Sequence, residues 1–148
     1  MLPDADVIGF ASGIDYGDLF GHRGLSHSLL FAAAWSSVVV LWEYRRVKKG
    51  CKEWWTLLGL FFMATASHGV LDAMTNGGLG VAFFSPFNTT RFFLPWRPIN
   101  VSPIGVGRFL SHRGAAVIIS ELLWIWLPLS VLWICAWLLR KGLLGQRN

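Results

Sequence analysis

Charged side chains are scarce in this chain of 148 residues, in which Asp, Glu, Lys and Arg together make up only 14%. Hydrophobic residues make up 54%, aromatic residues 15%, and the mean hydropathy is +0.51. A soluble domain of this length has too little interior to bury so many apolar side chains. The shortage of charge therefore excludes an ordinary soluble globular protein and predicts that lipid covers part of the surface.

Cysteine and acidic residues are also few. Cys51 and Cys135 are the two cysteines, and without CxxC spacing they exclude a zinc ribbon and a disulfide framework. Eight acidic residues stand against thirteen Lys and Arg, which leaves a net charge of +5. The basic residues gather in one short loop and at the C-terminus, as they do beside membrane spans. We therefore expect no nucleic-acid partner.

Three hydrophobic runs predict the fold. The expected fold class is all-α, a polytopic membrane helical bundle that forms a single membrane domain over residues 1–148. The predicted spans are residues 25–42, 54–73 and 115–139, with a long outer loop at 76–114. About 20 helical residues cross ~30 Å of hydrocarbon, so the second and third runs are long enough and the first is marginal.

The basic residues predict the orientation of these spans. Five of them lie within residues 45–52, and three more follow the last hydrophobic run. By the positive-inside rule both segments lie in the cytoplasm. Residues 1–27, the end of the second span and loop 76–114 then face outward, which in a bacterium is the periplasm. The sequence predicts a multi-pass protein of the bacterial inner membrane.

His68 and Asp72 stand out at the outer end of the second span. They are four residues apart, so in a helix they project from one face, as helix-borne ligands of a single metal ion do. Ionisable groups inside a span are costly and by default indicate function. A hydrogen bond between helices from His68, together with a solvated Asp72, is the ordinary alternative.

Two more pairs of polar residues belong to the same outer face. Asp4 and Asp6 are separated by one residue, so an extended backbone turns both carboxylates the same way. His22 and His27 lie around the start of the first span, where Ser26 is placed to cap the helix. A hydrated turn and interfacial histidines would explain each pair alone. The topology, however, brings all these groups together, and carboxylates with imidazoles suit Zn²⁺, Mn²⁺ or a two-metal site.

Three further residues are candidates for chemistry on a substrate. Glu121, about six residues into the third span, is a candidate general base, as is Asp6; a protonated structural glutamate is the alternative. Arg91 and Arg97 lie among aromatic residues of the outer loop and are candidates for binding a phosphate, because arginine binds phosphate in a bidentate fashion. Arginines that extend to the interface among aromatic rings are the ordinary alternative.

Several motifs stand out along the chain: LPDADVIGF, GHRGLSHSLLF and ASHGVLDAMTNGGLGV, followed by PWRPI and SPIG. Together they resemble the motifs of the YdjM family of bacterial inner-membrane proteins. The founding member of that family is LexA-regulated, and its members are predicted to be metal-dependent hydrolases. The resemblance covers nearly the whole chain. It implies a link to the SOS response and phospholipase- or phosphatase-like hydrolysis. The metal ligands that it implies are Asp4, Asp6, His22, His27, His68 and Asp72.

The chain departs from that family pattern at its start. Members that resemble it usually carry a hydrophobic helix with an early histidine before the LPDxD motif, whereas Met1 directly precedes Leu2 here. Either the chain starts late, or a preceding segment with one span and one further ligand is missing from the sequence.

The leading hypothesis is a membrane-bound hydrolase that uses one or two divalent ions at the periplasmic face, with zinc expected before manganese. Membrane lipid is the expected partner, and a lipid or another phosphoester is the expected substrate. The alternative is a non-enzymatic membrane protein, either a metal-ion carrier or a scaffold for partner helices. A carrier needs polar residues through the bilayer midplane, whereas the cytoplasmic halves of the spans are nearly uncharged. No feature of the sequence sets an oligomeric state.

Overall fold

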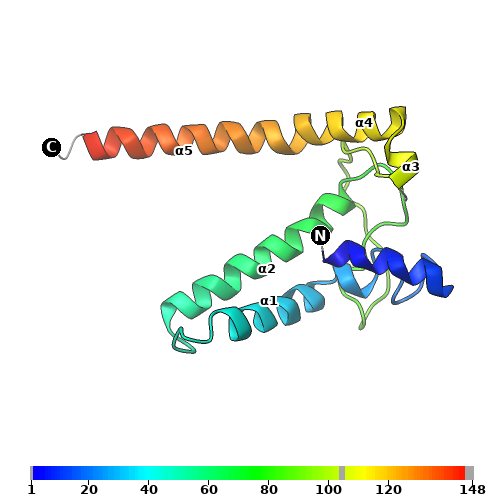
Figure 1. Ribbon diagram of the computed structural model, residues 1–148, viewed down its shortest axis with the longest axis horizontal. Helices are drawn as coiled ribbons and strands as arrows, with labels where there is room; N and C mark the ends of the chain where they lie inside the picture. The colour runs from blue at the N-terminus through cyan, green and yellow to red at the C-terminus, as the bar shows by residue number, and fades with distance from the viewer. Residues whose placement is uncertain (1, 104–105, 146–148) are drawn as a thin grey trace. The chain divides into compact units, whose positions relative to one another are not determined.

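The computed structural model describes residues 2–103 and 106–145. Among them the regular secondary structure is helical (Figure 1), and Val81 and Phe92 form an isolated antiparallel bridge. The all-α prediction is confirmed. The chain divides into two compact units, Met1–Arg97 and Pro98–Asn148. A single membrane domain over both units stays a prediction.

The first unit is built on a helical hairpin. Helix α1 (Leu29–Glu43) and helix α2 (Lys52–Ala73) lie side by side, and the basic loop 44–51 joins them (Figure 1). Small side chains on a helix let a neighbouring helix approach closely. The buried residues of α1 recur every four positions and are small or medium in size: Ala32, Ser36 and Val40.

Helix α1 begins later than predicted. Residues Leu25–His27 form one 3-10 turn, η2, and Ser28 is extended. Ser28 caps α1, because its hydroxyl oxygen accepts a hydrogen bond from the Phe31 N–H at 3.1 Å. The prediction that Ser26 caps this helix is therefore wrong, and the Ser26 hydroxyl donates to Asp6 instead.

Among the described residues, two helices rather than three are long and apolar enough to cross a membrane: α2 and the continuous helix His112–Lys141. Helix α1 has 15 residues, which at 1.5 Å per residue is about 22 Å, short of the ~30 Å hydrocarbon layer. The prediction of a full span at 25–42 is therefore wrong, because the residues before Leu29 form a turn and an extended cap. The predicted spans 54–73 and 115–139 lie within the two long helices.

The second unit is one long helix that follows a short one. Helix α3 covers Val106–Phe109. Helix α4 (His112–Glu121), a π-helical turn η3 (Leu122–Trp126) and helix α5 (Leu127–Gly145) then follow without a break (Figure 1). The wider π-turn comes directly before Pro128, whose ring would otherwise clash with the carbonyl group one turn earlier.

The N-terminal segment forms a 3-10 helix, η1 (Pro3–Ser12), and Pro3 at its first position has the fixed φ that suits a helix start. The prediction of an extended backbone at Asp4 and Asp6 is wrong. Because a 3-10 helix has three residues per turn, side chains two positions apart diverge by about 120°. The two carboxylates therefore approach His27 from different sides instead of pointing the same way.

The loop 74–97 joins both helices of the hairpin through backbone hydrogen bonds. The Leu94 N–H donates to the Ala73 carbonyl at the end of α2, at 2.9 Å. At the start of α1, the Leu29 N–H donates to the Phe83 carbonyl, at 3.0 Å. The loop thus holds together the hairpin end that carries η1 and lies opposite the basic loop (Figure 1).

Candidate metal centre

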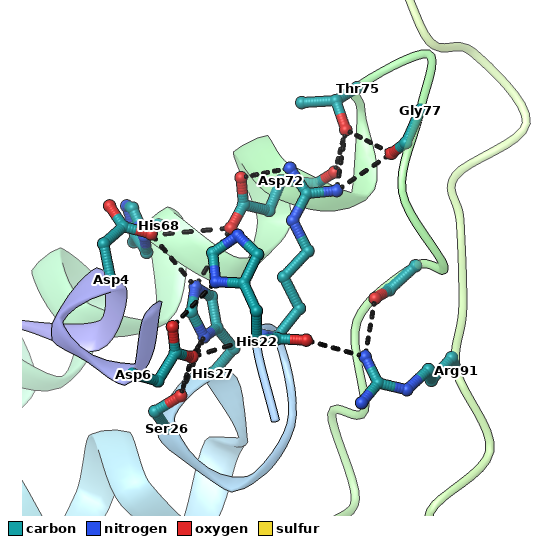
Figure 2. A network of polar contacts seen from close by, with 12 residues as sticks. Asp4, Asp6, His22, Ser26, His27, His68, Asp72, Thr75, Gly77 and Arg91 are labelled. Atoms are coloured by element: carbon teal, nitrogen blue, oxygen red, sulfur yellow. Dashed lines mark hydrogen bonds and ion pairs between the residues drawn. The ribbon is translucent and has the colours of Figure 1, made fainter. Parts of the chain in front are cut away.

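The six residues predicted as metal ligands lie together at this end of the hairpin (Figure 2). They come from η1, from the chain just before α1 and from the last turns of α2. They form two overlapping groups, and within each group one ligand atom per residue lies within 4.8 Å of the others. The inner group is Asp4, His27, His68 and Asp72, and the outer group is Asp6, His22 and His27.

The inner group brings two imidazole nitrogens to two carboxylates. His27 Nε2 lies 3.1 Å from Asp72 Oδ2 and 3.5 Å from Asp4 Oδ1. His68 Nε2 lies 3.1 Å from Asp4 Oδ1 and 3.7 Å from Asp72 Oδ2. Two nitrogen and two oxygen atoms therefore face one small space, and this number and kind of ligands suit Zn²⁺.

Two of these four atoms are buried without a hydrogen bond: His27 Nε2 and Asp72 Oδ2. They lie 3.1 Å apart, within ion-pair distance but without the geometry of a hydrogen bond. Buried polar atoms in proteins are nearly always hydrogen-bonded. A facing pair without hydrogen bonds fits a site in which both atoms bind the same cation.

The inner group is open on the side of Asp4. The side chain of Asp4 is 42% exposed, whereas that of His27 is fully buried and that of Asp72 is 17% exposed. Solvent therefore has access to the inner group beside Asp4.

Asp6, at the centre of the outer group, is surrounded by hydrogen-bond donors. Its Oδ1 lies 2.7 Å from His22 Nδ1. Its Oδ2 accepts hydrogen bonds from the Ser26 hydroxyl and, at 3.2 Å, from the Arg23 N–H. His27 Nδ1 lies 3.2 Å from the same oxygen. A carboxylate behind a metal-binding imidazole fixes the orientation and tautomer of the ring, and Asp6 has this position relative to His27.

Three carboxylates in this space make the cluster strongly attractive to positive charge. Burial alone would raise the pKa values of Asp4 and Asp6, but close contacts with the neighbouring imidazoles hold both pKa values far below the usual range. Burial alone would lower the pKa of His27, whereas the close carboxylates of Asp4, Asp6 and Asp72 raise that pKa to about 10. The cluster is therefore suited to hold either a proton on His27 or a cation in its place.

Arg23 is a member of the cluster that the sequence does not predict. Its side chain is buried, and its φ of 63° lies in the left-handed region that few residues other than glycine adopt. Its Nη2 donates to Asp72 Oδ1 at 2.9 Å. Its Nη1 donates to the Thr75 hydroxyl and to the Gly77 carbonyl, both at 3.0 Å. Arg23 thus ties the chain before α1 to the end of α2.

Glycines on both sides of His22 and Arg23 allow the tight turn of this segment. A Cβ atom at Gly21 would lie 2.2 Å from a backbone carbonyl oxygen, and one at Gly24 would lie 2.4 Å from another. Side chains are therefore excluded at both positions. This glycine–histidine–arginine–glycine spacing is the one sequence signal that marks Arg23 as part of a constrained site.

The two arginines predicted to bind a phosphate differ in their surroundings. Arg91 donates to the backbone carbonyl of His22 at 2.9 Å (Figure 2). It also donates to the Tyr16 carbonyl at 2.9 Å, and so holds the segment before α1. Arg97 is exposed, and its guanidinium carbon lies 4.8 Å from the centre of the Phe93 ring. Binding of a substrate by either arginine stays a prediction.

The two candidate general bases lie in different units. Asp6 belongs to the cluster, where both of its carboxylate oxygens have close donors. Glu121 is the last residue of α4, in the second unit. A catalytic role for either residue stays a prediction.

Comparison with known sequences identifies the family. The family described as YdjM inner membrane protein matches residues 1–143. Inner membrane protein YbcI of Escherichia coli (strain K12) is 42% identical over 141 residues, which make up 95% of this chain and 80% of the relative. No solved structure matches the chain. The two long apolar helices fit an inner membrane location. The chain belongs to the YdjM family of inner membrane proteins.

Proposed function

We propose that this protein is a metal-dependent hydrolase that holds one divalent ion, zinc before manganese, in the inner group. The observation that carries the proposal is the convergence of four ligand atoms, two of which are buried without a hydrogen bond. Two imidazoles with two carboxylates suit zinc, whereas manganese prefers sites that are richer in oxygen ligands. The proposed ligands are Asp4, His27, His68 and Asp72.

The ligands have unequal roles in this proposal. A catalytic zinc site has three protein ligands and an open position, and the ion lowers the pKa of a bound water and polarises the substrate. Three of the four proposed ligands have side chains that are at most 17% exposed and are therefore held in place by their surroundings: His27, His68 and Asp72. Asp4, the most exposed, lies at the open side. Asp6 orients His27, and His22 in turn contacts Asp6.

A phosphoester, in particular a lipid headgroup, is the substrate class that we propose. Asp72 is the next-to-last residue of α2, a helix long enough to cross the hydrocarbon layer. The site therefore lies where this helix leaves the hydrocarbon, at the level of the headgroups. Arg97 is the better candidate for the phosphate charge, because it is exposed while Arg91 is engaged by backbone carbonyls.

Zinc content and activity test this proposal together. The wild-type protein, purified in detergent, should keep one zinc ion per chain after dialysis and should hydrolyse a phosphodiester or phospholipid vesicles. Asp72→Asn keeps the side-chain shape but removes the negative charge, so this variant should fold and yet lose both zinc and turnover. Asp15→Asn changes an exposed acid of the same unit and should retain both.

Each other outcome has a defined meaning. A wild-type protein without bound zinc or manganese, or an Asp72→Asn variant with full activity, contradicts the proposal. A protein that binds zinc stoichiometrically but hydrolyses none of these substrates favours the metal-ion carrier.

We also propose that the site faces the periplasm of a multi-pass protein. The basic loop 44–51 and the cluster are at opposite ends of the hairpin, and the positive-inside rule assigns the loop to the cytoplasm. Cys51, the last residue of this loop, caps α2 and is partly exposed. In a Cys135→Ser background, a membrane-permeant maleimide should label Cys51 in intact spheroplasts and an impermeant one should not. Labelling by the impermeant reagent would reverse the orientation.

A further inference from the structure

We infer that Arg23 is the positioning residue of the metal centre, holding one oxygen of Asp72 so that the other faces the inner group. This inference rests on the proposed metal site. It assigns a function to a residue that is not itself a ligand, because arginine has no lone pair to offer a metal ion.

The two carboxylate oxygens of Asp72 have different surroundings. Its Oδ1 accepts a hydrogen bond from Arg23 Nη2 at 2.9 Å. Its Oδ2 is buried without a hydrogen bond and lies 3.1 Å from His27 Nε2 and 3.7 Å from His68 Nε2. An aspartate carboxylate rotates over a broad range of angles when nothing holds it. The contact with Arg23 therefore selects the orientation in which Oδ2 alone faces the two imidazoles.

Arg23 is itself held firmly enough to do this. Its side chain is 4% exposed, and Nη1 donates to the Thr75 hydroxyl and the Gly77 carbonyl just beyond α2. The planar guanidinium group thus has three partners in a fixed arrangement, which a lysine ammonium group cannot reproduce. The Arg23 N–H also donates to Asp6 Oδ2, so this residue contacts both groups of the cluster.

Arg23 also adjusts the charge of the site. With neutral imidazoles, the three carboxylates Asp4, Asp6 and Asp72 and the one guanidinium group leave two negative charges, which one divalent ion balances. Asp72 lies at the C-terminal end of α2, where the helix dipole disfavours a negative charge. The guanidinium group offsets that cost in the state without a metal ion.

Zinc affinity and the spectrum of bound cobalt separate positioning from mere structural support. Arg23→Gln, in purified protein, should weaken zinc binding by about 10- to 100-fold, the usual effect of losing a residue that orients a ligand. Arg23→Lys keeps the charge but has one donor group, and we expect it to fall between Arg23→Gln and the wild type. In both variants the visible absorption of Co²⁺ in the site should shift, because Asp72 becomes free to change its mode of binding.

Thr75→Val provides a matched control. It removes the other side-chain partner of Arg23 and leaves the Arg23–Asp72 pair in place. This variant should lower Tm, while its zinc affinity should fall less than that of Arg23→Lys, because Nη1 still donates to Gly77 and Nη2 still holds Asp72.

The alternatives are distinguishable. Arginine variants that unfold more easily, yet bind zinc with wild-type affinity and an unchanged cobalt spectrum, would show that Arg23 only supports the fold. A wild-type protein that binds neither Zn²⁺ nor Co²⁺ would overturn the proposed metal centre, and this inference with it.

Discussion

The inner and outer groups of the cluster contain the same residue types and share His27, yet their atoms are bonded differently. In the outer group, both oxygens of Asp6 have close donors. In the inner group, His27 Nε2 and Asp72 Oδ2 are buried and have none. Residue type therefore marks a candidate metal centre. Whether a buried polar atom has a hydrogen-bond partner then distinguishes a ligand from a residue that orients a ligand.

The largest difference between the groups should come from removing one imidazole in each. His68→Ala deletes a proposed ligand, so we expect zinc to be lost completely on dialysis. His22→Ala deletes a residue that is not a proposed ligand but contacts Asp6 and packs edge-to-face against the His27 ring, so zinc should remain bound with reduced affinity. Metal analysis of both purified variants is the measurement. Equal loss of zinc from both variants would contradict the different roles of the two groups and indicate that the outer group also binds an ion.

Asp6→Asn should have an intermediate effect. The amide keeps the shape of the side chain but removes the charge opposite His27 Nδ1, so the ring is less well oriented. We expect zinc affinity to fall by about 10- to 100-fold, with one ion still bound at saturation. Competition with a chromophoric chelator measures this change. A variant that cannot be saturated with zinc at all would place Asp6 among the ligands.

Ser26→Ala should have the smallest effect of this series. The Ser26 hydroxyl donates to Asp6 Oδ2, which also has the Arg23 N–H as a donor. Its loss should weaken zinc binding by less than about tenfold, the low end for residues behind a ligand. The same chelator titration applies, with Ser37→Ala as the control, since Ser37 bonds only within α1. A larger loss than in Asp6→Asn would assign Ser26 a direct contact with the ion or its water.

Much of the site could be predicted because its pattern is local. His68 and Asp72 are one helical turn apart, and helical periodicity alone puts them on one face. Length and hydropathy likewise predict α2 and the long helix His112–Lys141. The convergence of the remaining candidates followed from topology, because segments on one side of a membrane gather at one face.

The parts that could not be predicted depend on contacts between distant segments. The first hydrophobic run is expected to begin at residue 25, yet Leu25–His27 form a turn in which His27 and Ser26 contact Asp6. The 3-10 helix at the N-terminus has no periodic sequence signal. Arg23 resembles an interfacial arginine until Asp72 and Thr75, about 50 positions away, are brought to it.

The sequence alone predicts that the protein is helical and lies in a membrane. It also predicts that imidazoles and carboxylates gather at one end of its helical hairpin. Composition and helical periodicity are properties of neighbouring residues, so no partner is needed to interpret them. The tertiary structure was needed to show which oxygen of Asp72 faces the imidazoles, that His27 lies between Asp4 and Asp6, and that Arg23 contacts Asp72. These facts depend on hydrogen bonds between segments far apart in the chain, and hydrogen bonds of this kind are formed only when the fold closes.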